Sequence, residues 1–346
     1  MNFRKITLGV FSLLLLFSSC KKDDDGGGPA VVERDRTEQQ LIDNDSLVGY
    51  LETHYYNSSL FETPGNYGIS DIVIEELDQD EDGNYLPLED PENTTLLIDA
   101  VGSPRTTTYQ DVEYTYYVLS LNEGGGVMPN FCDSVRLNYS GMLQDHEVFD
   151  STVTPATFDL MQLIEGWRLV IPEFKTAVGN PSIGDDGIIT YENYGLGVMF
   201  LPSGLGYYGS TSGVISAYSN LIFKFELFQT ELNDHDEDLV PTYLEDIDGE
   251  DELYNDDTDG DDIPDFVDID DDGDGVATIN EVRTYSYSID TTIGEEDPLL
   301  AENEYVRKRT NNNGIITLKT VVLVDSDSND VPDYLQESIA VNLNED

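Results

Sequence analysis

The sequence predicts an α+β protein: an antiparallel sheet wrapped on one short helix, preceded by a small helix-containing region and followed by a loop-rich acidic region. Two alternating segments, DSVRLNYSG (133–141) and NLIFKFELFQ (220–229), are typical of half-buried strands. Between them, LMQLIEGWRLVIPEF (160–174) has apolar residues at helical spacing. From residue 233 onward, Asp and Glu dominate and aromatic residues become rarer. A sheet that packs on a separate helix is an α+β arrangement.

Length and charge bound the number of domains and the kind of partner. The chain has 346 residues, enough for about two domains. It carries 71 acidic and 16 basic side chains, a net charge of -55 at pH 7. Nucleic-acid binding needs a basic face, so this charge excludes nucleic acid as a partner and favours cation binding. The expected regions are 1–19, a signal peptide; 20–36, an acidic and Gly-rich tether; 37–111, an N-terminal region without a predicted role; 112–232, the main domain; and 233–346, acidic repeats.

The first residues have the features of a secretory signal. MNFRK is basic, ITLGVFSLLLLF is apolar, and SSC places small residues before Cys20. The apolar run is shorter than the roughly 20 residues of a membrane-spanning helix. The pattern resembles a bacterial lipoprotein signal, which implies a lipid anchor on Cys20; a plain secretory signal with an incidental cysteine is the alternative. KKDDDGGG, which follows, resembles the tether of Bacteroidota lipoproteins and implies an outer-membrane lipoprotein on the cell surface or the periplasmic face.

Residues 37–57 predict an amphipathic helix. Leu41, Leu47 and Leu51 fall near one face of it, and Thr37 is a candidate N-cap. The apolar face of this helix needs a partner surface.

The next apolar segments predict short strands. They are DIVIEEL (71–77), TLLIDAV (95–101) and VEYTYYVLSL (112–121), and the acidic stretch DQDEDGNY between the first two is a turn signal. Farther along, Pro172 should limit the helix expected in 160–174, because a proline inside a helix costs about 3 kcal/mol or more.

Two separated blocks of the main domain resemble the FKBP-type peptidyl-prolyl isomerases. The first is VRLNYSGMLQDHEVFDST (135–152) with the later LIEGW, and the second is FLPSGLGYYGSTSGVISAYSNLIFKFEL (200–227). The resemblance implies a bowl made by a curved antiparallel sheet against a short helix. Its implied pocket residues are Trp167 as the floor; Tyr139, Phe149, Leu163, Ile164, Tyr207, Ile215 and Phe223 as the walls; Asp150 at the rim; and the N–H of Ile164 as a donor to the bound peptide, with Phe158 as either wall or core.

The chemistry that this resemblance implies needs only a pocket. Rotation about the prolyl amide bond has a barrier of about 18–20 kcal/mol because of its partial double-bond character. No bond is broken, so neither a nucleophile nor a cofactor is required, and an apolar pocket favours the less polar, twisted amide. The implied partners are proline-containing polypeptides, in particular exported or surface proteins that fold slowly at X-Pro bonds.

Other interpretations remain open. The aromatic cluster is also compatible with a plain hydrophobic core, with a non-catalytic binding or scaffold protein, and with a calcium-dependent spacer that carries a vestigial domain. Departures from the family pattern are Pro172, the insertion NPSIGDDGIITYENYG (180–195), and an extra residue in the Tyr turn, where Tyr207 and Tyr208 compete for one position.

The acidic region contains a repeat that predicts calcium binding. Segments that begin at Asp234, Asp257 and Asp325 each have alternating acidic or amide residues, then a proline and an aromatic residue. Residues 270–281 have the EF-hand loop spacing, with carboxylates at positions one, three, five and twelve and Gly275 at position six. The region resembles thrombospondin type 3 calcium repeats; an unstructured acidic tail is the alternative. The expected ligands of structural calcium are Asp234, Asp236, Asp238, Asp257, Asp259, Asp261, Asp265, Asp268, Asp270, Asp272, Asp274, Glu281, Asp325, Asp327, Asn329 and Asp333.

Overall fold

A seven-stranded antiparallel sheet is the largest element of the computed structural model, which describes residues 33–152, 154–184 and 187–344. The predicted signal peptide and Cys20 lie outside these described residues. The strand order is β4-β5-β11-β12-β6-β7, and β8 also pairs with β6. The strands are β4 (Arg105–Tyr109), β5 (Val112–Asn122), β6 (Ser134–Met142), β7 (Val148–Ser151), β8 (Ala156–Asp159), β11 (Gly195–Leu201) and β12 (Leu221–Glu231).

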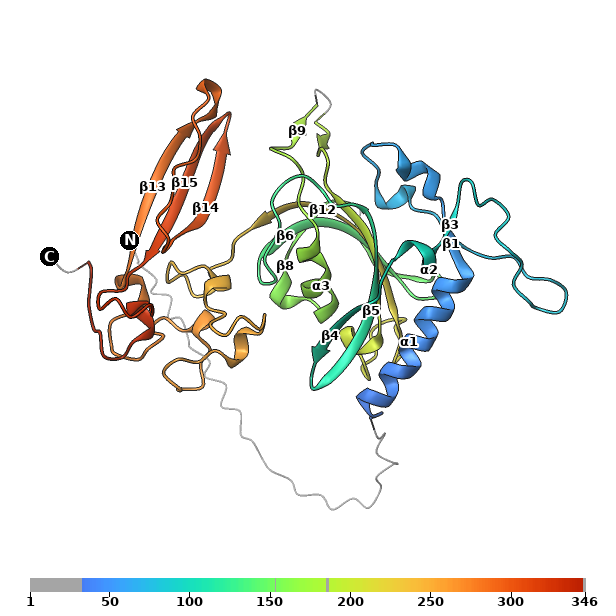
Figure 1. The fold of residues 1–346 in the computed structure, drawn as a ribbon, viewed down its shortest axis with the longest axis horizontal. Helices are drawn as coiled ribbons and strands as arrows, with labels where there is room; N and C mark the ends of the chain where they lie inside the picture. The colour runs from blue at the N-terminus through green and yellow to red at the C-terminus, as the bar shows by residue number, and fades with distance from the viewer. Residues whose placement is uncertain (1–32, 153, 185–186, 345–346) are drawn as a thin grey trace, which may run out of the picture. The chain divides into compact units, whose positions relative to one another are not determined.

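Both faces of this sheet are covered. Helix α3 (Glu165–Val170) packs on the concave face, and α1 (Arg36–Thr53) packs on the opposite face (Figure 1). Side chains of β5 alternate between the two cores: Tyr116 and Val118 face α3, whereas Tyr117 and Leu119 face α1. Double burial explains why the middle of this strand, residues 116–119, is apolar without interruption. The N-terminal region therefore closes the back of the sheet.

The predicted N-terminal helix is present, but its ends, its N-cap residue and its buried face differ from the prediction. It starts one residue earlier and ends at Thr53, after which the chain forms β1 (His54–Tyr56). Thr37 is not the N-cap, because the carboxylate of Asp35 accepts the N–H of Glu38 at 3.0 Å. Leu47 and Leu51 are fully buried as expected, but Leu41 is 66% exposed and does not belong to the packed face.

The strand predictions are confirmed in the main sheet and partly wrong before it. Segments 112–121, 133–141 and 220–229 form β5, β6 and β12. Segment 71–77 is extended only at β2 (Ile74–Glu76), and 95–101 forms β3 (Thr95–Leu96) followed by helix α2 (Leu97–Ala100). A helical turn places Leu97 and Val101 on the same face, where both are buried against α1. Strands β1, β2 and β3 make a three-stranded antiparallel sheet in the order β2-β1-β3.

The helix expected in 160–174 is limited by Pro172, as predicted. Helix α3 ends at Val170, and a 3₁₀ turn, η4 (Ile171–Glu173), takes in the proline. Another 3₁₀ turn, η3 (Leu160–Gln162), precedes α3. The insertion at 180–195 forms a small hairpin of β9 (Ser182–Ile183) and β10 (Ile189–Thr190).

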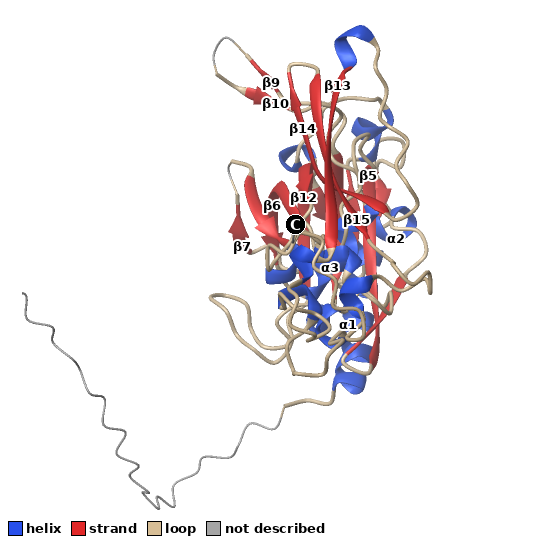
Figure 2. Ribbon diagram, turned by 90° about the vertical axis from the view of Figure 1, so that its left-hand side faces the viewer, coloured by secondary structure: helices blue, strands red, loops and turns tan. Residues whose placement is uncertain are grey.

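The acidic region combines 3₁₀ turns with a sheet. Each repeated proline, Pro241, Pro264 and Pro332, directly precedes a 3₁₀ turn: η6 (Thr242–Leu244), η8 (Asp265–Val267) and η11 (Asp333–Leu335). The expected loop-rich region also contains regular structure, because β13 (Val282–Asp290), β14 (Glu304–Asn312) and β15 (Ile315–Leu323) form an antiparallel sheet (Figure 2). The remaining 3₁₀ turns are η1 (Ser58–Glu62), η2 (Ile69–Asp71), η5 (Ser203–Leu205), η7 (Leu253–Asn255), η9 (Thr278–Asn280) and η10 (Thr291–Ile293).

Within the described part of the chain, the helices are all too short or too polar to cross a lipid bilayer.

Candidate active site

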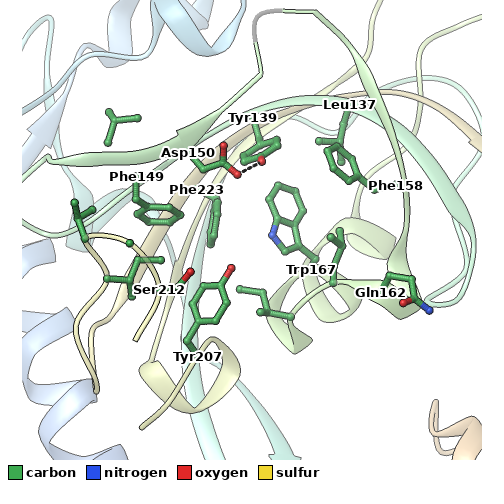
Figure 3. A pocket seen from close by; sticks show the side chains of 16 residues that line it. Leu137, Tyr139, Phe149, Asp150, Phe158, Gln162, Trp167, Tyr207, Ser212 and Phe223 are labelled. Atoms are coloured by element: carbon green, nitrogen blue, oxygen red, sulfur yellow. Dashed lines mark hydrogen bonds between the residues drawn. The ribbon is translucent and has the colours of Figure 1, made fainter. Parts of the chain in front are cut away.

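An open cavity of about 660 Å³ lies between the concave face of the main sheet and α3 (Figure 3). Aromatic and aliphatic side chains dominate its lining, and Asp150 is the one charged residue among them. A cavity of this size suits a small organic group or a short peptide segment. It is lined by Leu137, Tyr139, Val148, Phe149, Asp150, Phe158, Gln162, Leu163, Ile164, Trp167, Tyr207, Ser212, Gly213, Val214, Ile215 and Phe223.

Strand alternation brings the sheet side of the cavity together. Leu137 and Tyr139 of β6 point to the same face because side chains alternate along a strand. On the neighbouring strand β12, Phe223 pairs with Gly141 of β6, and the absence of a side chain at Gly141 leaves room for aromatic rings.

Trp167 of α3 forms the floor of the cavity. Its side chain is 4% exposed and meets Tyr139 and Phe223 edge to face, with ring centroids 5.6 Å and 5.1 Å away. Phe149 packs edge to face on Phe223 at 5.4 Å, and Phe158 on Tyr139 at 5.7 Å. Such edge-to-face pairs stabilise each other by about 0.5–1.5 kcal/mol beyond their buried area, so the walls are fixed before any ligand binds.

Asp150 is tied to the aromatic wall by a hydrogen bond. The hydroxyl of Tyr139 donates to the Asp150 carboxylate (Figure 3). The N–H of Ser151 donates to the other oxygen of this carboxylate at 2.9 Å. Burial, followed by the hydrogen bond and the charge of Asp150, raises the pKa of Tyr139 well above its usual value. Tyr139 therefore stays protonated and holds the exposed carboxylate at the rim.

The loop after β11 completes the cavity mouth. Tyr207 lines the mouth and is 38% exposed. Tyr208 is 5% exposed and packs edge to face against Tyr218. Ser212 and Ile215 bridge the loop through two backbone hydrogen bonds of 3.0 and 2.8 Å. Of the two tyrosines that compete in the sequence, Tyr207 is the one in the cavity.

The structure brings all nine expected pocket residues to this cavity, and Phe158 lies there as well. Ile164 directly precedes α3, where the first N–H groups of a helix have no intrahelical acceptor. Sequence reasoning missed six lining residues. The alternation of β6 could have identified Leu137, but the Ser212–Val214 turn carries no comparable signal. The missed residues are Leu137, Val148, Gln162, Ser212, Gly213 and Val214.

The expected calcium ligands are gathered only in part. Three compact groups contain them: Asp257 with Asp259 and Asp261; Asp270 with Asp272 and Asp274; and Asp236 with Asp238, Glu245 and Asp271. A fourth group contains none of them and consists of Asp246, Asp248 and Asp256.

The other expected ligands lie outside these groups. Asp234 pairs with Arg307 at 3.4 Å, and Asp265 and Asp333 each accept a backbone N–H at 2.8 Å. Asp268 accepts the N–H of Asp270 at 3.0 Å, and Asp325 accepts backbone N–H groups of its own turn. Glu281 is 1% exposed, whereas Asp327 and Asn329 are exposed and contact each other at 3.2 Å.

Glu245 and Asp271 were not expected as ligands. Glu245 stands at position twelve of a loop that begins at Asp234, the same spacing as in 270–281, so the sequence did carry a signal for it. The sequence carries no such signal for Asp271, because this residue joins the group only where two loops that are distant in sequence come together.

Sequence comparison relates part of the chain to proteins of known type. Over 111 residues it is 33% identical to the FKBP-type peptidyl-prolyl cis-trans isomerase FkpA of Aeromonas hydrophila, covering 31% of this chain and 35% of that protein. Over 115 residues it is 31% identical to the outer membrane protein MIP of Legionella longbeachae, covering 32% of this chain and 42% of that protein. The chain thus spans less than half of the length of these curated relatives. Residues 235–301 match the family model described as BamM C-terminal.

Two solved structures are also similar to parts of the chain. They are a peptidyl-prolyl cis-trans isomerase of Pseudomonas syringae pv. tomato and FkpA of Escherichia coli, both at 22% identity and a TM-score of 0.29. Each match covers 38% of this chain. It covers 86% of the Pseudomonas chain and 55% of the Escherichia coli FkpA chain. By sequence alone, about a third of the chain is similar to an FKBP-type peptidyl-prolyl cis-trans isomerase.

Proposed function

We propose that this protein is a peptidyl-prolyl cis-trans isomerase that binds proline-containing polypeptides in the cavity above Trp167. The observation that supports it best is the gathering of all nine pocket residues that the resemblance implies around one cavity that opens to solvent. A cluster that served only as a hydrophobic core would be filled by its own side chains.

The cavity suits the chemistry of amide rotation. In the planar ground state the prolyl amide is polar, and twisting it localises the nitrogen lone pair and reduces that polarity. Rings of Tyr139, Phe149 and Phe223 offer apolar surface to the pyrrolidine and keep water away from the amide. The pocket therefore stabilises the twisted amide more than the planar one, which is the condition for a faster rotation.

Two polar groups orient the peptide in this proposal. Asp150, held by Tyr139, faces the cavity from its rim and accepts a hydrogen bond from the bound chain. The N–H of Ile164 donates to a peptide carbonyl on the opposite side, next to Trp167. Neither group transfers a proton, because no covalent bond to the proline is made or broken.

The proposed location is the outer membrane, through a lipid on Cys20. Support comes from the signal-like first residues, from the printed name of the Legionella relative as an outer membrane protein, and from the match to the BamM C-terminal family. The substrates would then be exported or surface proteins that fold at X-Pro bonds.

A protease-coupled assay with a proline tetrapeptide tests the isomerase. The wild type should accelerate the cis-to-trans step. Asp150→Ala should lower kcat/KM at least fivefold, whereas Glu147→Ala, which removes the same charge from an exposed site outside the cavity, should leave it unchanged. No acceleration by the wild type, together with a change in Trp167 fluorescence on peptide binding, would establish a non-catalytic binding protein instead.

A further inference from the structure

Two acidic loops of the C-terminal region meet at one point. One carboxylate oxygen from each of Asp236, Asp238, Glu245 and Asp271 lies within 4.8 Å of the other three. The first three residues belong to the loop 234–245, and Asp271 belongs to the loop 270–281. Alternate residues of the second loop face different ways: Asp270, Asp272 and Asp274 form their own group, while Asp271 joins the first loop.

Three of these carboxylates are buried and Asp236 is half-buried, and each of the four has at least one oxygen without a hydrogen-bond partner among the described residues. Glu245 is 0% exposed, Asp271 is 1% exposed, and neither carboxylate has a hydrogen-bond partner on either oxygen among the described residues. Asp236 and Asp238 each use one oxygen for a backbone N–H, at 3.2 and 2.8 Å, and leave the other oxygen without a partner. None of the four makes an ion pair with a basic side chain in the part of the chain that the structure describes.

Four such groups cannot share a buried site as bare anions. Removing one carboxylate from water without compensation is already costly, and its neighbours repel it further. Burial, followed by the charges of the neighbouring carboxylates, raises the pKa of Glu245 to about 11 and that of Asp271 to about 10. The site therefore needs positive charge at its centre, either as protons or as a cation.

We propose that Asp236, Asp238, Glu245 and Asp271 together bind one calcium ion that fastens the two loops to each other. Calcium takes six to eight oxygen ligands at about 2.3–2.6 Å, so ligands on opposite sides of the ion are about 5 Å apart, which fits this group. Magnesium keeps several waters and uses one or two carboxylates, and zinc prefers nitrogen and sulfur ligands. Protons would neutralise the group but would not explain why the unpartnered oxygens of separate loops converge on one centre.

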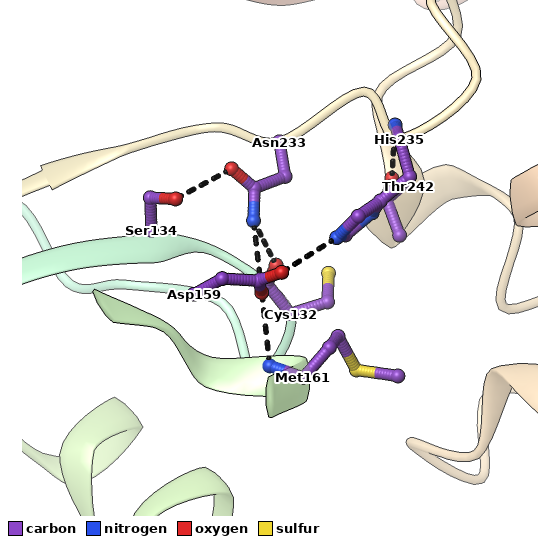
Figure 4. A network of polar contacts seen from close by, with 7 residues as sticks. All are labelled: Cys132, Ser134, Asp159, Met161, Asn233, His235 and Thr242. Atoms are coloured by element: carbon purple, nitrogen blue, oxygen red, sulfur yellow. Dashed lines mark hydrogen bonds and ion pairs between the residues drawn. The ribbon is translucent and has the colours of Figure 1, made fainter. Parts of the chain in front are cut away.

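The loop that supplies three ligands is also hydrogen-bonded to the main sheet (Figure 4). Its His235 contacts Thr242 at 2.7 Å and Asp159, the last residue of β8, at 3.2 Å. Asn233, just before the loop, donates to the Cys132 carbonyl at 2.8 Å and accepts from Ser134 at 2.8 Å. Ion binding is therefore expected to order the loop and, with it, the contact to the strands that carry the cavity.

Calcium titration of the full chain by calorimetry, after treatment with EGTA and buffer exchange, tests this site. Glu245→Gln and Asp271→Asn keep side-chain size and should each remove one bound calcium or weaken its binding at least tenfold. Glu250→Gln makes the same charge change at an exposed residue outside all four acidic groups and should bind calcium as the wild type does. Millimolar magnesium should not substitute.

Thermal unfolding gives a second measurement that does not depend on binding heat. Calcium should raise the Tm of the wild type by several degrees, and this rise should shrink in Glu245→Gln and Asp271→Asn. In EGTA both variants should unfold at or above the wild-type Tm, because each removes a carboxyl group that the ion-free fold must either protonate or bury as an anion. Wild-type calcium binding in both variants would overturn the proposal. So would a wild-type Tm that is the same in EGTA and in calcium, since protons would then neutralise the group.

Discussion

Replacing Gly141 by alanine should displace two aromatic walls of the cavity. A Cβ at this position would lie 2.6 Å from two atoms of the Phe149 ring and 2.7 Å from one atom of the Phe223 ring. Carbon atoms of different groups pack at about 3.5–4.0 Å, so both rings must move away from the new Cβ by roughly 1 Å. Phe223 is 4% exposed and confined, whereas Phe149 is half-buried, so we expect Phe149 to move farther.

The expected effects of Gly141→Ala follow from this displacement. Overpacking of this kind costs about 1–3 kcal/mol of unfolding free energy. A misplacement of about 1 Å in a positioned site lowers activity up to about 100-fold, so kcat/KM should fall by tenfold or more. The matched control is Gly49→Ala in α1, where a Cβ meets nothing within 4 Å, and which should stabilise the helix by about 0.5–1 kcal/mol without affecting activity.

The measurements are kcat/KM in the prolyl isomerase assay and the affinity for a proline peptide from Trp167 fluorescence. The second measurement reports on the wall even if the protein only binds peptides. Wild-type turnover and wild-type affinity in Gly141→Ala would refute the assignment of Phe149 and Phe223 as walls of a functional pocket.

Three further predictions concern the rim, the back of the sheet and the acidic loops. Tyr139→Phe keeps the ring but removes the donor to Asp150, and should lower kcat/KM about three- to tenfold with little change in Tm; an unchanged kcat/KM would contradict a role for this hydrogen bond. Glu226→Ala removes a 7% exposed carboxylate that accepts N–H groups from two other segments at 2.7 Å each, and should cost about 2–3 kcal/mol in urea unfolding while leaving turnover near the wild-type value. In EGTA the Tm should fall as the pH rises from 5 to 9, because burial and repulsion raise the pKa of Asp236 to about 7 and that of Asp238 to about 8. A carboxyl group whose pKa is higher in the folded than in the unfolded protein contributes its full stability at a pH below the unfolded-state pKa. It loses this contribution as the pH rises through the folded-state pKa. A Tm that stays constant from pH 5 to 9 would therefore argue against this buried group of carboxylates.

The strands of the main sheet could be predicted because their signals are local, whereas the pocket residues were expected from the resemblance of two sequence blocks to the FKBP-type peptidyl-prolyl isomerases. Alternation along β6 and β12 places one set of side chains on one face whatever the partner strands are. Pro172 limits α3 because its ring clashes with the preceding helical turn and its nitrogen has no hydrogen to donate.

What the sequence did not determine depends on contacts between distant segments. The 95–101 segment became a helical turn because Leu97 and Val101 pack on α1. Strand β12 is buried on both faces, which alternation alone does not indicate. Asp271 has the same local character as its acidic neighbours, yet it alone among the residues of 270–274 faces the first loop. Periodicity along a chain fixes which side chains share a face, but burial and charge depend on what packs against that face, and only the tertiary structure decides that.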